Sequence, residues 1–342
     1  MDARKPDKSR ISAVFNRKLP DRIPNFEVLV DNPTLSHVMG RPMPTHTLDN
    51  IPPEDYLEFA NRVGQDVIGM CFYDNPFCYE GPDGGPKALD FRITCREDWK
   101  RVLPPDISRL DKRFELLDRY EKTVSGLEAG LFVLLGSFFT NTYDSVFGFD
   151  QFMYMLYDDP ALVEEVVAAG ADYCVEIARR VVQRDLTFFY VGDDVAFKSA
   201  TLIHPDQLRK IFLPHLKRVF QPAIDRGIPI LYHSDGNIRA LIPDLIDLGI
   251  NALNPIEPYG MDIEEIKREF GRDIALVGNL DVGGSLSRGT QDDVRRDTRA
   301  LIDAVGRDGG LVVASSHSIT KNVKPENYLA MVETAQTYGI YS

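Results

Sequence analysis

The sequence predicts an α/β protein folded as a (β/α)8 TIM barrel. Short apolar runs rich in β-branched and aromatic residues alternate with longer stretches in which apolar residues recur at helical spacing, which is typical of parallel βαβ units. Eight such runs fit within 342 residues, a length at which an α/β barrel occurs as one domain. A doubly wound open sheet is the alternative, but the glycines of EGPDGGP lie in a loop with no helix behind them, so no dinucleotide fingerprint follows the first strand.

The predicted strands are continuous apolar runs, as expected for strands that are buried on both faces. Taken in chain order, they are Ile23–Val28, Asp66–Phe72, Leu131–Gly136, Thr187–Gly192, Ile228–His233, Ala252–Ile256, Ile274–Gly278 and Leu311–Ala314.

The predicted helices lie between these runs, and two of them have a proline at a first-turn position, Pro205 and Pro325. They are expected at Pro53–Val63, Asp159–Arg180, Pro205–Asp225, Ile238–Leu248, Ile263–Phe270, Gln291–Val305 and Pro325–Tyr338. Residues 1–20 are expected to form a loose N-terminal arm or an oligomer contact, and residues 21–342 the barrel domain. A long insertion is expected near 75–125, carrying Trp99 and a helix near Leu110–Tyr120.

Composition narrows the classes of function. The net charge is −13 and the isoelectric point is near 5.0, so the surface would repel nucleic-acid backbones and anionic membranes. Four scattered cysteines without a CxxC pair argue against a disulfide framework or a zinc ribbon. The charged N-terminus lacks the apolar core of a signal peptide, and no apolar run approaches the roughly 20 residues of a membrane span. We therefore expect a cytoplasmic protein that binds neither nucleic acid nor membrane.

Polar side chains follow each predicted strand, at the end where a barrel carries its chemistry. In chain order they are Asn25 and Glu27; Tyr73, Asp74 and Asn75; Ser137, Thr140, Asn141 and Tyr143; Asp193 and Asp194; His233 and Asp235; Asn254 and Glu257; Asn279 and Asp281; and Ser315, Ser316 and His317. Aspartate, glutamate, histidine and asparagine dominate this ring, which suits a metal ion, a cation or acid/base chemistry.

Two details of the ring follow from strand geometry. Side chains alternate along a strand, so His233 and Asp235 face the same side, where they can share a metal or form a His–carboxylate pair. Asp193 and Asp194 face opposite sides, so only one of them can face the barrel mouth, and the sequence leaves open which one does. Glu257 either contacts a ligand or braces its own loop, and His37 and His46, in a proline-rich region, have no assigned place.

Several motifs resemble the uroporphyrinogen decarboxylase superfamily, which includes corrinoid-dependent methyltransferases. They are GDD at 192–194, ILYHSDGNI at 230–238, LNPIEP at 253–258, LVGNLD at 276–281, and SSHSI with PEN at 315–327. The resemblance is strongest over residues 185–342, and it implies the same (β/α)8 barrel that the alternation predicts.

The resemblance to true decarboxylases is partial. Asp74 resembles their pyrrole-binding aspartate, and Tyr143 and His317 resemble their tyrosine and late histidine. The region that would carry their arginine-rich loop reads NFEVLVDNPT here, without arginine, and an eight-carboxylate tetrapyrrole would be repelled by Glu27 and Asp31.

The methyltransferase branch fits better. Its thiol-specific members bind zinc through a His-x-Cys after the fifth strand and a later cysteine, whereas this chain has His233-Ser-Asp235 and, approximately, Ser316-His317. A soft thiolate site has thus become a hard nitrogen and oxygen site. The resemblance implies Zn²⁺ or another divalent ion held by His233, Asp235 and His317, with help from Asp194 or Glu257.

We therefore expect a methyltransferase subunit that moves a methyl group from a small donor, such as a methoxylated aromatic, to the corrinoid of a partner protein. The catalytic candidates are Asp74, Tyr143, Asp194, His233 and His317. The candidate substrate-binding residues are Glu27, Tyr73, Phe138, Asn254, Glu257 and Asn279. Phe139 and Tyr259 are further aromatic candidates for the barrel mouth.

Two alternatives remain open: a cofactor-free decarboxylase of the uroporphyrinogen type, and a ligand-binding barrel without catalysis. A homodimer is expected from the superfamily.

Overall fold

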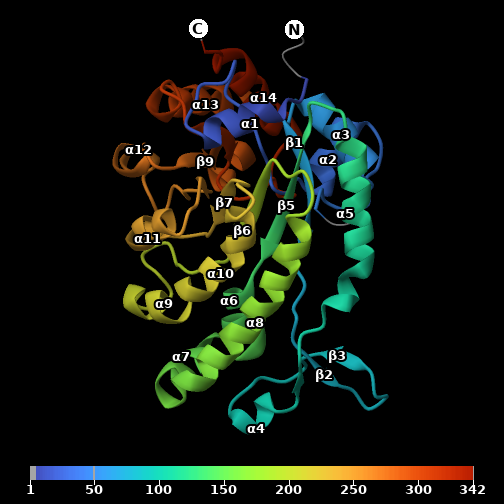
Figure 1. Cartoon of the computed structure of the whole chain (residues 1–342). Coiled ribbons are helices and arrows are strands. Elements are labelled where there is room, and N and C mark those ends of the chain that lie inside the picture. Colours follow the sequence, from blue (N-terminus) through green and yellow to red (C-terminus); the bar gives the residue numbers. More distant parts are fainter. Residues whose placement is uncertain (1–4, 49–50, 342) are drawn as a thin grey trace.

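The computed structural model describes residues 5–48 and 51–341. Its centre is a parallel sheet of seven strands, curled as in a TIM barrel (Figure 1). The strands follow one another around the sheet in chain order: β1 (Val67–Phe72), β5 (Gly130–Gly136), β6 (Phe188–Gly192), β7 (Ile230–His233), β8 (Ala252–Asn254), β9 (Ala275–Leu280) and β10 (Leu311–Ser315). The predicted fold class is therefore confirmed.

The strand register sets the level at which the polar strand ends meet. Gly192 of β6 pairs with His233 of β7, and His233 pairs with Asn254 of β8. Because the last residues of β6 and β7 are paired in this register, the residues that follow the two strands lie beside each other at the carboxyl end of the sheet. Residues about 40 positions apart in the chain thus become neighbours.

The first predicted strand, Ile23–Val28, was wrong, because the segment that runs beside β10 is irregular. It makes only isolated bridges, Asn25 with Val313 and Val30 with Ile319, and the Val313 amide donates to the Pro24 carbonyl at 2.9 Å. On the side of β1, the Glu27 amide donates to the Gln65 side chain at 3.1 Å. Pro24 has no N–H to give to a ladder, which favours this looser arrangement.

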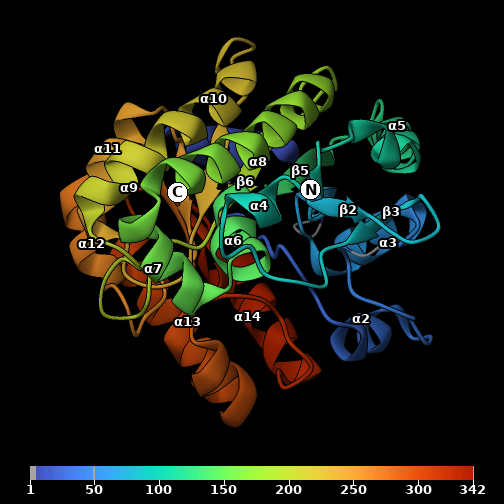
Figure 2. The same cartoon turned by 90° about the horizontal axis from the view of Figure 1, so that it is seen from below.

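Helices surround the sheet, as the view along the barrel shows (Figure 2). Those between and after the barrel strands are α5 (Asp111–Val124), α6 (Phe138–Thr140), α7 (Phe149–Asp158), α8 (Pro160–Val181), α9 (Pro205–Ile211), α10 (Leu213–Ile224), α11 (Ile242–Asp247), α12 (Ile263–Phe270), α13 (Gln291–Val305) and α14 (Pro325–Tyr338). Before β1 lie α2 (Asn32–Met39) and α3 (Pro53–Val63), and the short turns are η1 (Ile107–Leu110), η2 (Asn141–Val146), η3 (Arg239–Leu241) and η4 (Val282–Leu286).

One predicted helix is divided in two. The pattern over Pro205–Asp225 contains a break at Phe212, where α9 ends and α10 begins. Pro214 cannot donate a backbone hydrogen bond to the preceding turn, so the helix restarts there. The long helix predicted at Asp159–Arg180 is found as α8.

The N-terminal segment is part of the barrel, which differs from the expected loose arm. Helix α1 (Lys8–Phe15) places Ile11, Val14 and Phe15 in the same apolar cluster as the inward-facing residues of the sheet. It lies at the end of the molecule where both chain termini are found, away from α7 (Figure 1). The amino end of the barrel is thus covered by α1.

An ionic cluster holds α1 in place. The guanidinium of Arg10 donates to Asp66 at 2.9 Å and to Asp21 at 2.7 Å, and Arg22 lies 3.4 Å from the same Asp66 oxygen. The side chains of Arg10, Arg22 and Asp66 are at most 7% exposed. We call Arg10, Arg22 and Asp66 the amino-end cluster.

The predicted insertion is shorter than expected. A small antiparallel sheet of β2 (Cys78–Glu80), β3 (Pro86–Ala88) and β4 (Val102–Leu103), with α4 (Arg96–Trp99), extends beyond the carboxyl end of the barrel (Figure 1). Helix α5, which was assigned to the insertion, packs on β1, β5 and α3 and is a barrel helix. No helix in the described part of the chain is long and apolar enough to cross a membrane.

Candidate active site

A cavity of about 360 Å³ opens at the carboxyl end of the barrel. Its volume is at the small end of the range for small-molecule pockets, roughly 300–1,000 Å³. One side carries polar groups from β6, β7 and the segment after β10, and the rest of the wall is mainly apolar. The lining residues are Val28, Leu29, His46, Leu48, Cys71, Tyr73, Leu134, Tyr190, Gly192, Asp194, His233, His317 and Ser318.

His233 is oriented by a buried amide. Its Nδ1 lies 2.7 Å from Asn254 Oδ1, and the Asn254 amide nitrogen donates to the Val277 carbonyl at 2.9 Å. This second bond fixes the orientation of the amide, so Oδ1 must accept from an N–H at Nδ1. Tyr190 Oη donates to the same Oδ1 at 2.7 Å. The other ring nitrogen, Nε2, is thereby left with a lone pair toward the cavity.

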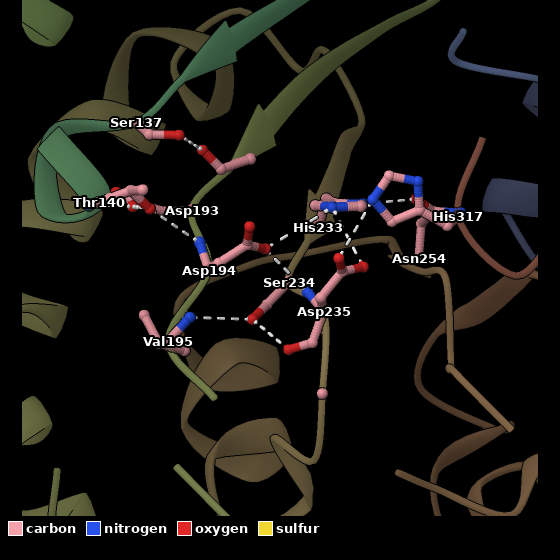
Figure 3. A network of polar contacts seen from close by, with 12 residues as sticks. Ser137, Thr140, Asp193, Asp194, Val195, His233, Ser234, Asp235, Asn254 and His317 are labelled. Atoms are coloured by element: carbon pink, nitrogen blue, oxygen red, sulfur yellow. Dashed lines mark hydrogen bonds and ion pairs between the residues drawn. The ribbon is translucent and has the colours of Figure 1, made fainter. Parts of the chain in front are cut away.

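Two carboxylates flank that nitrogen (Figure 3). His233 Nε2 lies 3.7 Å from Asp194 Oδ1 and 3.7 Å from Asp235 Oδ1, and one ligand atom from each of the three residues fits within a 4.8 Å cluster. Asp235 Oδ1 is buried and has no hydrogen-bond partner among the described residues. We call Asp194, His233 and Asp235 the acidic triad.

The triad fits a divalent metal ion. A tetrahedral ion with ligands about 2.1 Å away holds them roughly 3.4 Å apart, close to the spacings seen here. Nitrogen and carboxylate oxygen donors suit Zn²⁺ and similar ions, and a partnerless buried carboxylate oxygen is the kind of atom that an ion would satisfy. The predicted metal set of His233, Asp235 and His317 differs from this cluster in one member, since Asp194 joins it in place of His317.

His317 approaches the triad from β10. Its Nε2 lies 3.3 Å from Asp235 Oδ2, and its ring is 6.5 Å from that of His233. The hydrogen bond to Asp235 and the carboxylates around it raise the pKa of His317. Burial alone would raise the pKa of Asp235, but the hydrogen bond from His317 and the electrostatic effect of the neighbouring basic groups outweigh it and lower that pKa. The two groups therefore favour an imidazolium–carboxylate pair.

The structure shows which aspartate of the GDD motif faces the cavity. Asp193 is 1% exposed and accepts hydrogen bonds from the amides of Phe139 and Thr140 at 2.9 and 2.7 Å. Burial raises the pKa of Asp193 to about 7. Asp194 points the other way, and its Oδ1 accepts from the Asp235 amide at 2.9 Å. The alternation argument predicted this division of roles but could not assign it.

Two residues expected to take part in catalysis lie elsewhere. Asp74 does not line the cavity, because its carboxylate forms an ion pair with Arg113 of α5 at 3.0 Å. Tyr143 donates to the Asp194 carbonyl at 3.1 Å, and burial raises its pKa. Neither residue is among those that line the cavity.

The candidate substrate-binding residues divide into two groups. Tyr73 lines the cavity, and Asn254 and Glu257 support it, Glu257 by accepting from the Gly236 amide at 3.3 Å. The other three candidates, Glu27, Phe138 and Asn279, are not among the residues that line the cavity.

Glu27 is 2% exposed and accepts hydrogen bonds from the Ser315 amide and hydroxyl. Phe138 is also 2% exposed, and its ring stacks on that of Phe212. The Asn279 side chain donates to the Ile256 carbonyl. The prediction that they contact substrate does not agree with these positions. Phe139 is likewise fully buried, and Tyr259 is exposed and bonded to Asp281.

Strand ends alone did not reveal two lining residues, Tyr190 and His46. Tyr190 lies inside β6, two residues before Gly192, and strand alternation could have placed it on the cavity side. His46 comes from an irregular segment held by the Thr47 amide, which donates to the Val30 carbonyl at 3.1 Å. Nothing in the local sequence indicates that this segment returns to the barrel mouth.

The protein is thus an α/β barrel with a polar cavity at the carboxyl end of its strands, and comparison with known proteins identifies the family. The family model described as uroporphyrinogen decarboxylase (URO-D) matches residues 79–338. The chain belongs to this family, which places it among enzymes.

Curated relatives have low identity. A uroporphyrinogen decarboxylase of Neisseria gonorrhoeae is 24% identical over 262 residues, covering 73% of this chain and 70% of the relative. One of Methylococcus capsulatus is 26% identical over 188 residues, covering 54% and 51%.

Among solved structures, a methyltransferase from Methanosarcina mazei matches with a TM-score of 0.73 at 19% identity. The match covers 97% of this chain and 98% of that one. At this identity the likeness concerns the fold.

Proposed function

We propose that this protein is a methyltransferase subunit that transfers a methyl group from a small methyl ether or related donor to the corrinoid of a partner protein. The observation that carries the proposal is the acidic triad at one side of a small cavity whose other walls are mainly apolar. Such a site can bind a compact apolar molecule and act on one heteroatom of it.

The charge of the cavity argues for this donor class. The carboxylate of Asp194 lines it and that of Asp235 lies within the same cluster, and no lysine or arginine occurs among its lining residues in the described chain. A polyanionic tetrapyrrole would need cationic partners for its carboxylates. A neutral or cationic donor meets no such requirement.

Asp194, His233 and Asp235 would hold a divalent ion, which when bound supplies a Lewis acid for the heteroatom of the donor. The chain's own residues prepare this site. Asn254 keeps the His233 lone pair directed at the cavity, and the Asp235 amide orients Asp194. The methyl group would pass to the corrinoid of a partner protein, which would supply the nucleophile.

His317 is suited to the proton that the reaction requires. When the bond between methyl carbon and oxygen breaks, the methyl group leaves for the acceptor and the oxygen keeps the electron pair. Asp235 keeps His317 protonated, so His317 can give a proton to that oxygen. The side chain of His317 is 54% exposed, so solvent can reprotonate it.

The direct test mixes the purified protein with cob(I)alamin and a panel of methyl ethers and follows methylation of the cobalt by its absorbance. We expect turnover with at least one donor and a loss of at least about 100-fold in His233→Ala and Asp194→Asn, consistent with loss of a ligand or its support. Asp292→Asn is the matched control, because its side chain is 93% exposed and far outside the site. Absence of turnover across the panel would contradict the proposal.

Elemental analysis tests the metal separately. Protein loaded with Zn²⁺ and then desalted should hold close to one ion per chain, and His233→Ala should hold almost none. Equal retention by both proteins would exclude the acidic triad as the metal site.

A decarboxylase is the second candidate, favoured by the names of the curated relatives. Its pyrrole-binding aspartate would be Asp74, which here is paired with Arg113. Incubation with uroporphyrinogen distinguishes the two: release of carbon dioxide and formation of coproporphyrinogen would favour the decarboxylase.

A further inference from the structure

Glu27 is a buried acid that the proposed reaction does not use. Its side chain is 2% exposed, and the next two residues, Val28 and Leu29, line the cavity. One residue engages both of its carboxyl oxygens: Oε1 accepts from the Ser315 amide at 2.6 Å, and Oε2 lies 2.8 Å from the Ser315 hydroxyl. Burying a carboxyl group costs free energy, and these two bonds offset part of that cost.

The barrel sheet is interrupted beside β10, and Glu27 lies at the interruption. Around Val313 the bonding is still that of a parallel ladder, since its amide donates to the Pro24 carbonyl at 2.9 Å and its carbonyl accepts from the Phe26 amide at 3.1 Å. If this ladder continued, the Ser315 amide would donate to the next backbone carbonyl in step along the same segment. The Glu27 side chain accepts it instead. The carboxyl group therefore replaces the backbone carbonyl of a regular eighth strand.

The other side of the interruption is closed by a side chain as well. The Glu27 amide donates to the Gln65 side chain at 3.1 Å, and the Gln65 amide nitrogen donates to the Val67 carbonyl of β1 at 2.9 Å. Gln65 is fully buried. Two buried side chains thus connect the irregular segment to β10 and to β1, and the segment is held in the barrel without forming a strand.

The bond to Ser315 lies at the start of the segment that carries His317. Beyond His317 the Ile319 amide donates to the Leu29 carbonyl at 2.9 Å. His317 therefore lies between two attachments to the irregular segment, and its Nε2 is 3.3 Å from Asp235 Oδ2. Of these two attachments, the one at Ser315 is made by a side chain, so a single substitution can remove it.

We infer that Glu27 is a positioning residue, whose carboxyl group fixes Ser315 and thereby holds the His317 ring beside Asp235. The catalytic consequence rests on the proposed function, in which His317 gives a proton to the departing oxygen, whereas the position of the ring does not. Burial raises the pKa of Glu27 to about 8, so at neutral pH the carboxyl group is mostly protonated and can accept from the Ser315 amide while donating to its hydroxyl. A glutamine side chain offers the same acceptor and donor.

Histidine NMR tests the position of the ring without any reaction. The chain has six histidines, so isotopically labelled histidine gives few ring signals, and His317→Ala identifies the one that matters. We expect this signal to keep its position in Glu27→Gln. It should shift or broaden in Glu27→Leu, which cannot bind Ser315, and in Glu27→Asp, whose carboxyl group is one methylene short. The signal of His204, whose side chain is 71% exposed and does not line the cavity, should not move in any variant.

An unchanged His317 signal in folded Glu27→Leu would overturn the inference, and so would a change in Glu27→Gln as large as that in Glu27→Leu. Circular dichroism checks folding. If Glu27→Leu does not fold, Glu27→Asp decides by the same criterion. Failure of both variants to fold would mean that Glu27 serves the whole barrel, which would also overturn the inference.

Kinetics test whether the position of the ring matters for the reaction. With a methyl ether that methylates cob(I)alamin, Glu27→Leu should lower kcat about 10- to 100-fold and leave KM within about twofold, because a misplacement of about 1 Å can cost that much. Glu27→Gln should retain kcat within about threefold. In a His317→Ala background, Glu27→Leu should change kcat by less than about twofold, since its effect passes through His317. Equal losses in both backgrounds would overturn this route. Glu115→Gln, at an exposed position of α5, is the control.

Failure of this inference is distinguishable from failure of the proposed function. A His317 signal that shifts in Glu27→Leu, without methylation of cob(I)alamin by any donor, would support the positioning role and contradict methyl transfer. Methylation that Glu27→Leu leaves intact would do the reverse.

Discussion

The two ends of this barrel carry charged clusters that differ in how completely their charges are compensated. At the amino end, Asp66 lies between Arg10 and Arg22 and also accepts from the Asp7 amide at 2.9 Å. At the carboxyl end, Asp194 and Asp235 face each other across His233, with Nε2 3.7 Å from each carboxylate. In the first cluster two buried guanidiniums compensate one carboxylate, whereas in the second the two carboxylates have only imidazoles beside them, His233 and, 3.3 Å from Asp235 Oδ2, His317.

The difference indicates what each cluster does. A buried charge with its partners in place fixes one arrangement of the chain, here the docking of α1. Two carboxylates and an imidazole held close together at the wall of a cavity form a site that a metal or substrate can occupy. Five predictions test this contrast, and the first concerns the buried carboxylate of the amino-end cluster.

Removing Asp66 should cause the greatest loss of stability. Asp66→Ala leaves the buried guanidiniums of Arg10 and Arg22 without this carboxylate, and breaking a buried pair costs about 3–5 kcal/mol. Urea unfolding followed by circular dichroism measures the change. Asp185→Asn, at an exposed ion pair with Lys8, should change stability by less than about 1 kcal/mol. Similar small losses in both variants would show that the amino-end cluster does not hold the barrel closed.

Metal addition should stabilise the carboxyl end. Zn²⁺ at a hundred times its dissociation constant should add about 2.7 kcal/mol to the free energy of unfolding if it binds only the folded protein. The gain should vanish in His233→Ala and persist in Asp66→Ala. A gain that survives the loss of His233 would place the metal elsewhere.

Removing one triad carboxylate should have little effect on the stability of the metal-free protein, or even increase it. Asp194→Asn keeps an oxygen that can accept from the Asp235 amide and removes a charge that serves function and not folding, so we expect a change between zero and a rise of about 1 kcal/mol. The same variant should lose metal binding and activity. Thermal unfolding with and without a chelator measures both effects, and a large loss of stability without metal would show that the triad serves the fold.

The stability that the His317–Asp235 pair contributes should fall both at high pH, where His317 loses its proton, and at low pH, where Asp235 gains one. The pKa of His317 is raised, so its stabilising contribution is complete below about pH 6.5 and is lost as the pH rises through the folded value. The pKa of Asp235 is lowered, so its contribution is present above its ordinary range and is lost as the pH falls through the folded value.

NMR titration of the His317 ring should give a pKa above 6.5 in the wild-type protein and a lower one in Asp235→Asn. The exposure of His317 limits the contribution to stability to about 1 kcal/mol or less. An identical titration in both proteins would show that the two groups do not interact in solution.

A separate pH effect is expected at Glu27, a buried acid that accepts hydrogen bonds from Ser315. Burial raises its pKa to about 8, so the folded protein holds its proton more tightly than the unfolded chain, and this stabilisation declines between about pH 4.5 and 8. Glu27→Gln removes the titration and should therefore gain stability relative to wild type as the pH rises through this range. Unfolding measured at pH 5 and pH 8 tests this, and a relative loss at pH 8 would mean that Glu27 is ionised in the fold.

Local pattern was enough to predict much of the barrel and the centre of the site. Seven of the eight predicted strands were found, and the period-two argument correctly placed His233 and Asp235 on one side, with Ser234 turned away to accept from the Val195 amide at 3.1 Å. The strand predicted at Ile23–Val28 was wrong because the segment binds to β10 only at isolated points, and composition does not report such contacts.

Residues expected at the mouth by their position in the chain were less reliable. Glu27, Phe138 and Asn279 follow or begin polar strand ends, yet each is engaged by neighbouring backbone or rings away from the cavity. Conversely, Tyr190 and His46 line it. Its position after a strand places a polar residue near the barrel mouth, but the hydrogen-bond partners available to its side chain decide whether that side chain points into the cavity.

The order of residues by itself determined the alternation of strands and helices, the acidic character of the chain and the pairing of an imidazole with a carboxylate two positions later, because these depend on periodicity and composition. Only the tertiary structure decided that Asp194 and not Asp193 faces the cavity, that α1 covers the amino end, and that His46 lines the same cavity as His233. The physical reason is that each of these outcomes depends on a partner far away in the chain, such as the amides of Phe139 and Thr140 for Asp193 or the carboxylate of Asp66 for Arg10.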